Sequence, residues 1–171
     1  MKHTLIVLVI VISLFSNCKK DKLPKATQSG NNTFGCKIDG ALFKPSERGG
    51  LFGSPPVTVD NLRLNGFTLQ AKYYGDGADT KRRSVTIYLE YLRGTGTFTL
   101  NGGPNIGVYE FDYAGGPPRY ATDAAHTGSV TITRCDTVNR IYSGTFFFTA
   151  IDKNTGKVVK VTDGRFDVKQ S

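Results

Sequence analysis

Short runs of alternating apolar and polar residues fill the chain from residue 34 onward, separated by glycine, asparagine and aspartate. Such runs favour β-strands, because successive side chains of a strand point to opposite faces. No segment after residue 18 has the apolar spacing of an amphipathic helix. The pattern predicts an all-β domain of roughly nine or ten hairpin-connected strands, folded as a single antiparallel β-sandwich or a partly closed barrel.

The dipeptide Asn65-Gly66 gives the most specific hairpin signal, in the segment VTVDNLRLNGFTLQAKYY. It suits a two-residue turn whose central residues both need positive φ. With this turn, Leu64 opposes Phe67 and Leu62 opposes Leu69, so the four apolar side chains share one face of the sheet.

Two other segments carry information about the sheet. Asp39-Gly40 predicts another two-residue turn, between strands at residues 34–38 and 41–45. Residues 146–148 are three successive phenylalanines, which places aromatic rings on both faces of one strand. That strand is therefore either central in the sheet or packed on both sides.

The first 17 residues follow a different pattern. Lys2 and His3 precede an apolar stretch, residues 5–15, of 11 residues. A transmembrane helix needs about 20 apolar residues, whereas a charged start and a short apolar core are typical of a secretory signal peptide. We therefore expect residues 1–17 to be a signal peptide.

The signal peptide ends in LFSN, directly before Cys18. This motif resembles the lipobox of bacterial lipoproteins, in the looser form common in Bacteroidota-type lipoproteins. The resemblance implies that Cys18 is diacylated, that the chain is cut before it and that the new amino terminus is acylated. Two or more acyl chains hold a protein stably on a membrane. Residues 18–33 contain four lysines, one leucine and no aromatic residue, which predicts a flexible tether before a β domain at residues 34–171.

Both ends of the β domain resemble one family. GSVTITRCDTVNRIYSGTFFFTAIDKNTGKVVKVTDGRFDV, residues 128–168, is similar to the C-terminal half of a family of uncharacterised Bacteroidota-type lipoproteins. TFGCKIDGALFKP, residues 33–45, resembles the first hairpin of the same family. The resemblance implies a location in the cell envelope, lipid-anchored to the outer membrane and facing the periplasm or the surface. It supplies no catalytic residues.

Residue types that carry catalysis or bind metals are sparse. His126 is the one histidine after the signal peptide, and Asp123 and Ser129 lie near it in sequence. A catalytic triad is defined by spatial geometry, and the chain lacks a G-x-S-x-G elbow. One histidine and two further cysteines without C-x-x-C spacing do not make a zinc site. We therefore expect no enzyme activity, no metal and no cofactor.

Two cysteines besides Cys18 are present, Cys36 and Cys135. An exported protein meets an oxidising compartment, where a disulfide between them could form. Cys36 is in phase with the apolar residues of its strand and Cys135 is not. A bridge and two free thiols therefore both stay open.

Aromatic residues are the best candidates for ligand contact. Tyrosine suits a sheet surface that is partly buried and partly exposed to solvent. Tyr73 and Tyr113 could therefore be half-buried sheet residues, or they could stack on a ligand such as a carbohydrate, a peptide or an envelope protein. Nucleic acid is not an expected partner, because the net charge of +8 is scattered rather than gathered in a stripe with aromatics.

These features together predict a membrane-anchored lipoprotein that binds a ligand or braces the envelope. The alternatives are a hydrolase of envelope or glycan material, and an accessory subunit or inhibitor of a neighbouring complex.

The lipid anchor leads to a first prediction. Replacing Cys18 with serine removes the thiol that accepts the diacylglycerol, so the protein should leave the membrane fraction or accumulate with its signal peptide attached. Fractionation and gel mobility measure both effects. Full membrane retention of a normally processed Cys18→Ser chain would contradict the assignment.

Overall fold

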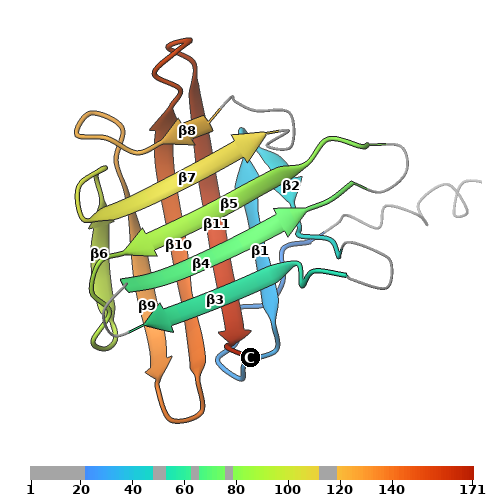
Figure 1. Ribbon diagram of the computed structural model, residues 1–171, viewed down its shortest axis with the longest axis vertical. Helices are drawn as coiled ribbons and strands as arrows, with labels where there is room; N and C mark the ends of the chain where they lie inside the picture. Colours follow the sequence, from blue (N-terminus) through green and yellow to red (C-terminus); the bar gives the residue numbers. More distant parts are fainter. Residues whose placement is uncertain (1–21, 48–52, 63–65, 76–78, 112–118) are drawn as a thin grey trace, which may run out of the picture.

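The protein folds into a single antiparallel β-sheet, which confirms the predicted all-β class. The computed structural model describes residues 22–47, 53–62, 66–75, 79–111 and 119–171. These residues form eleven strands and no helix, so no membrane-spanning helix is found in this part of the chain. The sheet curls into a half-barrel around one core (Figure 1).

The eleven strands have between 3 and 12 residues each. Their bounds are β1 Thr33–Ile38, β2 Ala41–Phe43, β3 Val57–Leu62, β4 Gly66–Tyr73, β5 Arg83–Leu89, β6 Gly96–Leu100, β7 Asn105–Phe111, β8 Arg119–Ala121, β9 Gly128–Asp136, β10 Ile141–Ile151 and β11 Val158–Lys169.

The long strand β10 joins the two halves of the sheet. One edge of β10 pairs with β11, while its other edge pairs with β9 from Ile141 to Phe148 and with β8 at Ile151. The main order is β2-β1-β11-β10-β8-β7-β5-β4-β3, and β9 carries β6 on its far side. Because two strands share one edge of β10, the sheet splits there. Figure 1 shows β3, β4, β5 and β7 crossing obliquely in front of β9, β10, β11 and β1.

The core lies between these two layers and follows the alternation of each strand. The rings of Phe67 on β4 and Tyr142 on β10 meet across it, with centroids 5.5 Å apart. The fully buried side chains with the largest volumes include Phe67, Phe148, Leu69, Ile87, Leu89, Leu100 and Ile132. The outward side of β10 is less covered, because Phe147 is 58% exposed. The strand is therefore central in the hydrogen-bonded sheet but open on one face at this residue.

Three glycines within strands lie against phenylalanine rings. A Cβ atom on Gly107 of β7 would lie 2.9 Å from the Phe148 ring of the opposite layer. Within the rear layer, a Cβ on Gly164 would lie 2.5 Å from the Phe146 ring, and one on Gly144 would lie 2.8 Å from Phe166. Glycine within a strand often marks such a close approach.

The two predicted hairpins have different outcomes. Asp39 and Gly40 have φ values of 48° and 84°, and Ile38 pairs with Ala41, so this turn is confirmed. The predicted register of the β3–β4 hairpin is wrong by three residues.

In the β3–β4 hairpin, Phe67 pairs with Asn61 and Leu69 pairs with Val59. This register turns Val59, 9% exposed, towards the core beside β4. Phe67 and Leu69 thus oppose odd-numbered residues of β3, whereas the prediction paired Leu69 with Leu62 and Phe67 with Leu64, which lies outside the described residues. Asn65 lies outside the described residues, while Gly66 has the expected positive φ, at 77°.

Gly66 and Gly40 provide a matched pair of substitutions, because both have positive φ and differ in their surroundings. A Cβ on Gly40 meets nothing within 4 Å, whereas one on Gly66 would lie 2.5 Å from the carbonyl oxygen of Leu89. Gly40→Ala should lower the free energy of unfolding by about 1–2 kcal/mol, the cost of a left-handed alanine. Gly66→Ala should cost clearly more, since the chain must also move away from that carbonyl. Urea unfolding compares them, and equal losses would contradict the close approach at Gly66.

Candidate functional site

A hollow of about 390 Å³ opens at one end of the half-barrel, where β3 and β5 end and β4 begins. In Figure 1 these strand ends lie at the left, on the side away from β1 and β2. We call this hollow the mouth; it is lined by Asn61, Gly66, Glu90, Tyr91, Arg93 and Thr137, with Leu92 beneath them. The polar groups thus come from the end of β3, from the segment after β5 and from the turn between β9 and β10.

The segment after β5 holds the most exposed aromatic ring of the mouth. The strand ends at Leu89, and the Glu90 amide donates to the Pro104 carbonyl oxygen at 3.0 Å. Leu92 is buried in the core, at 9% exposure. With Leu92 pointing inward, Tyr91 and Arg93 on either side are exposed, and Tyr91 has 60% of its surface open. The core therefore fixes the backbone from which both side chains project.

The facing wall of the mouth is also held by hydrogen bonds. The Asn61 amide nitrogen donates to the Tyr142 hydroxyl at 3.0 Å, which ties β3 to the opposite layer. Thr137 lies in the turn between β9 and β10, where Asp136 accepts two hydrogen bonds from Asn139, both of 2.8 Å. These bonds, and a third from Arg134, hold the pKa of Asp136 well below its usual range. The turn that carries Thr137 is thus organised around an ionised carboxylate.

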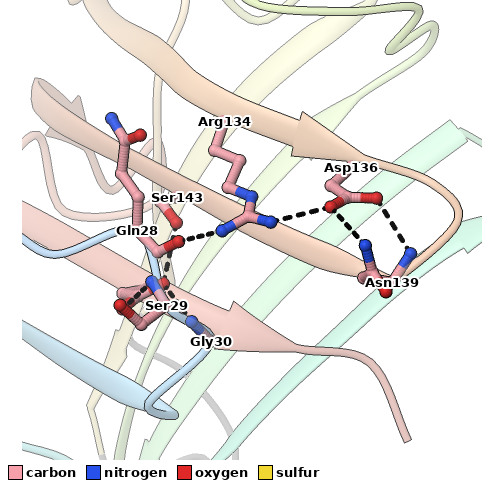
Figure 2. A network of polar contacts seen from close by, with 8 residues as sticks. Gln28, Ser29, Gly30, Arg134, Asp136, Asn139 and Ser143 are labelled. Carbon is pink, nitrogen blue, oxygen red and sulfur yellow. Dashed lines mark hydrogen bonds and ion pairs between the residues drawn. The ribbon is translucent and has the colours of Figure 1, made fainter.

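A second polar network holds the segment of residues 22–32 against the sheet through contacts between Pro24 and Asn32. Figure 2 shows the part of this network at Gln28, Ser29 and Gly30. Asp167 on β11 is 1% exposed and accepts hydrogen bonds from the Thr27 hydroxyl at 2.6 Å, the Gly30 amide at 2.7 Å and the Ser143 hydroxyl at 2.8 Å. The Ser29 amide donates to it as well, at 2.9 Å. This part of the chain, which composition assigned to a flexible tether, is therefore a docked segment.

The two networks are connected. One end of the Arg134 guanidinium donates to Asp136 at 2.7 Å, and the other donates to the backbone carbonyl of Gln28. Figure 2 shows this arginine between the β9–β10 turn and the N-terminal segment. Further along the segment, Arg165 donates to the Pro24 carbonyl at 3.3 Å. The docked segment therefore contacts β9, β10 and β11.

Burial and hydrogen bonding have opposite effects on the pKa of Asp167. Burial alone raises the pKa of a carboxyl, because it penalises the charged form. The donors from Thr27, Ser29, Gly30 and Ser143 outweigh that effect and lower the pKa from 3.8 to about 2. The docked segment therefore depends on the charged form of Asp167.

Of the two tyrosines predicted to stack on a ligand, the structure describes Tyr73. Tyr73 is half-buried against the core, and the Arg83 guanidinium lies 5.1 Å from its ring centroid. Its ring is thus already packed by protein groups. Tyr113 and the predicted lipidation site Cys18 lie outside the described residues.

Cys36 and Cys135 are free thiols that the fold keeps apart. Cys36 lies on β1 and Cys135 on β9, with β11 and β10 between them in the sheet. Three strand spacings amount to roughly 14 Å, whereas bridged cysteines have Cα atoms within about 7 Å. The disulfide that the sequence left open is therefore not formed. Burial raises the pKa of the Cys36 thiol far above its usual range.

His126 pairs with its neighbour Asp123 in the loop before β9. The His126 ring Nδ1 and its backbone amide lie 2.9 Å and 2.7 Å from Asp123 Oδ1, and the Ala125 amide donates to the same oxygen at 3.0 Å. These contacts close a local turn. Among the described residues, no group of three or more histidine, cysteine, aspartate or glutamate side chains could hold a metal ion.

The sequence did not distinguish Tyr91 from the other tyrosines, because of the alternation around it. Tyr91 is in phase with Val85, Ile87 and Leu89, which all face the core, so the pattern placed it inside. The strand ends before Tyr91, and Leu92 takes the inward position. The Arg93-Gly94 break that follows was the available signal that alternation stops near this point.

The pKa of Asp167 leads to a prediction about stability in acid. Its folded-state pKa of about 2 lies below its ordinary value of 3.8, so its contribution is complete above about pH 4 and is lost as the pH falls towards 2. The contribution is about 2 kcal/mol. Other carboxyl groups with lowered pKa values also reduce the stability as the pH falls; they belong to Asp123, Asp136, Asp152 and Asp163.

The variant Asp167→Asn separates the contribution of Asp167 to stability from that of the other aspartates. It should lower the free energy of unfolding near pH 7 by about 2 kcal/mol or more, because an amide nitrogen then faces buried donors. Its difference from the natural chain should shrink towards pH 2. Asp163→Asn, on the same strand but 47% exposed, is the control and should have a much smaller effect. Urea unfolding at several pH values tests this, and a constant difference across the range would contradict the assignment.

Comparison with known proteins gives a family without an assigned activity. No curated protein and no solved structure matches the chain. Residues 75–168, more than half of the chain, match a family described as a domain of unknown function (DUF6252). The match includes β5 to β11, and with them Tyr91, Thr137 and Asp167. The chain therefore belongs to the DUF6252 family.

Proposed function

We propose that this protein is a lipid-anchored lipoprotein of the cell envelope that binds a small carbohydrate in the mouth. The observation that carries the binding role is Tyr91, which is 60% exposed at a polar hollow of about 390 Å³. Sites for small ligands have volumes of roughly 300–1,000 Å³ and a few polar groups that orient the ligand. The mouth lies at the small end of this range.

The residues of the mouth match the chemistry of a sugar. One face of a pyranose ring presents C–H groups, whose hydrogens carry a small positive charge. These groups pack on the face of an aromatic ring, which is the negative part of its quadrupole. Around Tyr91, the Glu90 carboxylate accepts hydrogen bonds, the Arg93 guanidinium donates them and the Thr137 hydroxyl does both. Sugar hydroxyls need this mixture of donors and acceptors.

The same residues favour binding over hydrolysis. Glycosidases ordinarily use two carboxyl groups on either side of the scissile bond. Among the residues that line the mouth, Glu90 supplies a carboxylate and no second acid accompanies it. A binding role therefore fits the mouth better than the alternative role of an envelope or glycan hydrolase.

The anchor part of the proposal is supported by the sequence around Cys18. The motif LFSNC resembles a lipobox, and lysines follow it at positions 19, 20, 22 and 25. Each lysine near an anionic membrane surface contributes roughly 1 kcal/mol to binding. Lys22 and Lys25 are exposed. Their exposure leaves these charges available to lipid headgroups.

Replacing Tyr91 with alanine should weaken carbohydrate binding about tenfold or more. Truncating an aromatic residue that dominates a binding site costs about 2 kcal/mol or more of binding free energy, and about 1.4 kcal/mol already corresponds to a tenfold loss. The ligand is first identified with the purified protein on an array of bacterial envelope oligosaccharides and common glycans. Titration calorimetry with the best-binding glycan then compares the variants. Tyr91→Phe keeps the ring and should retain most of the affinity.

His126→Ala provides the control, because His126 bonds to Asp123 in a loop that does not line the mouth. It should leave the affinity unchanged. Unchanged affinity in Tyr91→Ala, or loss of affinity in His126→Ala with the fold intact by circular dichroism, would overturn the assignment of the mouth.

A further inference from the structure

Docking of residues 22–32 shortens the part of the chain that can separate the domain from a membrane. An extended chain spans at most about 3.4 Å per residue. Were all residues before β1 free, the path from Cys18 to Thr33 could reach roughly 50 Å. Since the chain is already held at Pro24 and Thr27, the free path from Cys18 to Pro24 spans at most about 20 Å. A lipid on Cys18 would therefore keep the domain against the bilayer.

The docked segment begins beside a particular face of the sheet. Gly35 of β1 lies beneath Pro24 and Leu23, since a Cβ there would lie 2.6 Å from Pro24 Cδ and 3.2 Å from Leu23 Cδ2. Arg165, which pairs with Gly35 in the sheet, donates to the Pro24 carbonyl. The same arginine lines an open hollow of about 280 Å³ together with Thr145, Phe147 and Asp163. The start of the segment thus borders the surface around Phe147.

This surface, which we call the Phe147 face, is the outward side of β9, β10 and β11. Two of its apolar side chains are exposed without a cover, Phe147 at 58% and Val158 at 45%. Hydroxyl groups surround Phe147, and those of Thr97 and Thr131 lie 3.0 Å apart. The face therefore offers apolar groups within a polar surround.

Exposed lysines give the Phe147 face and its border a positive charge. Lys160 is exposed on β11, and Lys22 and Lys25 are exposed on the docked segment. Asp163, the acid that lines the hollow, is paired with Lys37 at 2.9 Å. An aromatic side chain amid cations suits the interface of an anionic bilayer, where rings lie at the headgroup level and lysines meet anionic lipids.

We infer that the Phe147 face rests on the anionic membrane surface, with the Phe147 ring among the headgroups. The inference rests on the lipid anchor of the proposed function, and it adds an orientation of the domain to that anchor. The mouth, at the far ends of β3 and β5, is then left free to meet its ligand.

The chain contains no tryptophan, so single tryptophans can report contact with lipid. Phe147→Trp places one on the proposed contact face, and Tyr91→Trp places one in the mouth. The two positions are matched, because their side chains are 58% and 60% exposed. Both variants are purified as full-length, processed lipoproteins and reconstituted on vesicles of phosphatidylglycerol and phosphatidylethanolamine with brominated acyl chains, which quench nearby indole fluorescence.

The expected result is at least twofold stronger quenching at position 147 than at position 91, with a blue-shifted emission at 147. Replacing phosphatidylglycerol with neutral phosphatidylcholine should reduce the difference. Vesicle flotation measures membrane anchoring, independently of the orientation that quenching reports. Flotation with equal quenching, or with stronger quenching at position 91, overturns the orientation while the anchor stands. Failure of both proteins to float refutes the anchor and, with it, the orientation.

Discussion

Contacts between phenylalanine rings and strand glycines set how closely the two layers and their strands pack, and the fold depends on this close packing. Gly107 lies against Phe148 across the two layers, and Gly164 and Gly144 lie against Phe146 and Phe166 within the rear layer. A side chain at Gly107 would push the layers apart at the centre of the core. Since protein interiors are close-packed, such a displacement cannot be absorbed locally. The large rings of β10 and β11 are therefore compatible only with glycine at the positions they cover.

The curl that these contacts permit also forms the mouth. β10 pairs with β9 on the same edge that meets β8, so the layers turn relative to each other. At one end, β3, β4 and β5 approach the β9–β10 turn with the segment around Tyr91 between them. The Asn61–Tyr142 hydrogen bond and the buried Leu92 hold the two walls. A polar hollow thus forms where the ends of β3 and β5 meet the turn between β9 and β10.

The sequence predicts local features of this fold well and long-range ones poorly. Asp39-Gly40 determines its turn through its own backbone preferences, so the prediction succeeded. The β3–β4 register failed because it depends on which residues of β3 pack on the core. Docking of the N-terminal segment could not be foreseen from composition, since its stabilising carboxylate, Asp167, is 140 residues from Thr27. Tyr91 was not distinguished from the other tyrosines because alternation does not reveal where a strand ends.

The partner of the docked segment is also the last strand of the chain. β11 pairs with both β1 and β10, and it carries the carboxylate that holds Thr27 and Gly30. During synthesis, the N-terminal segment emerges first and reaches Asp167, which accepts most of its hydrogen bonds, only after β11 has followed. Closing so long a loop is entropically costly, and it requires the intervening sheet to bring the ends together. Docking is therefore a late event in folding, and a newly synthesised chain has a longer, looser N-terminal arm than the folded protein.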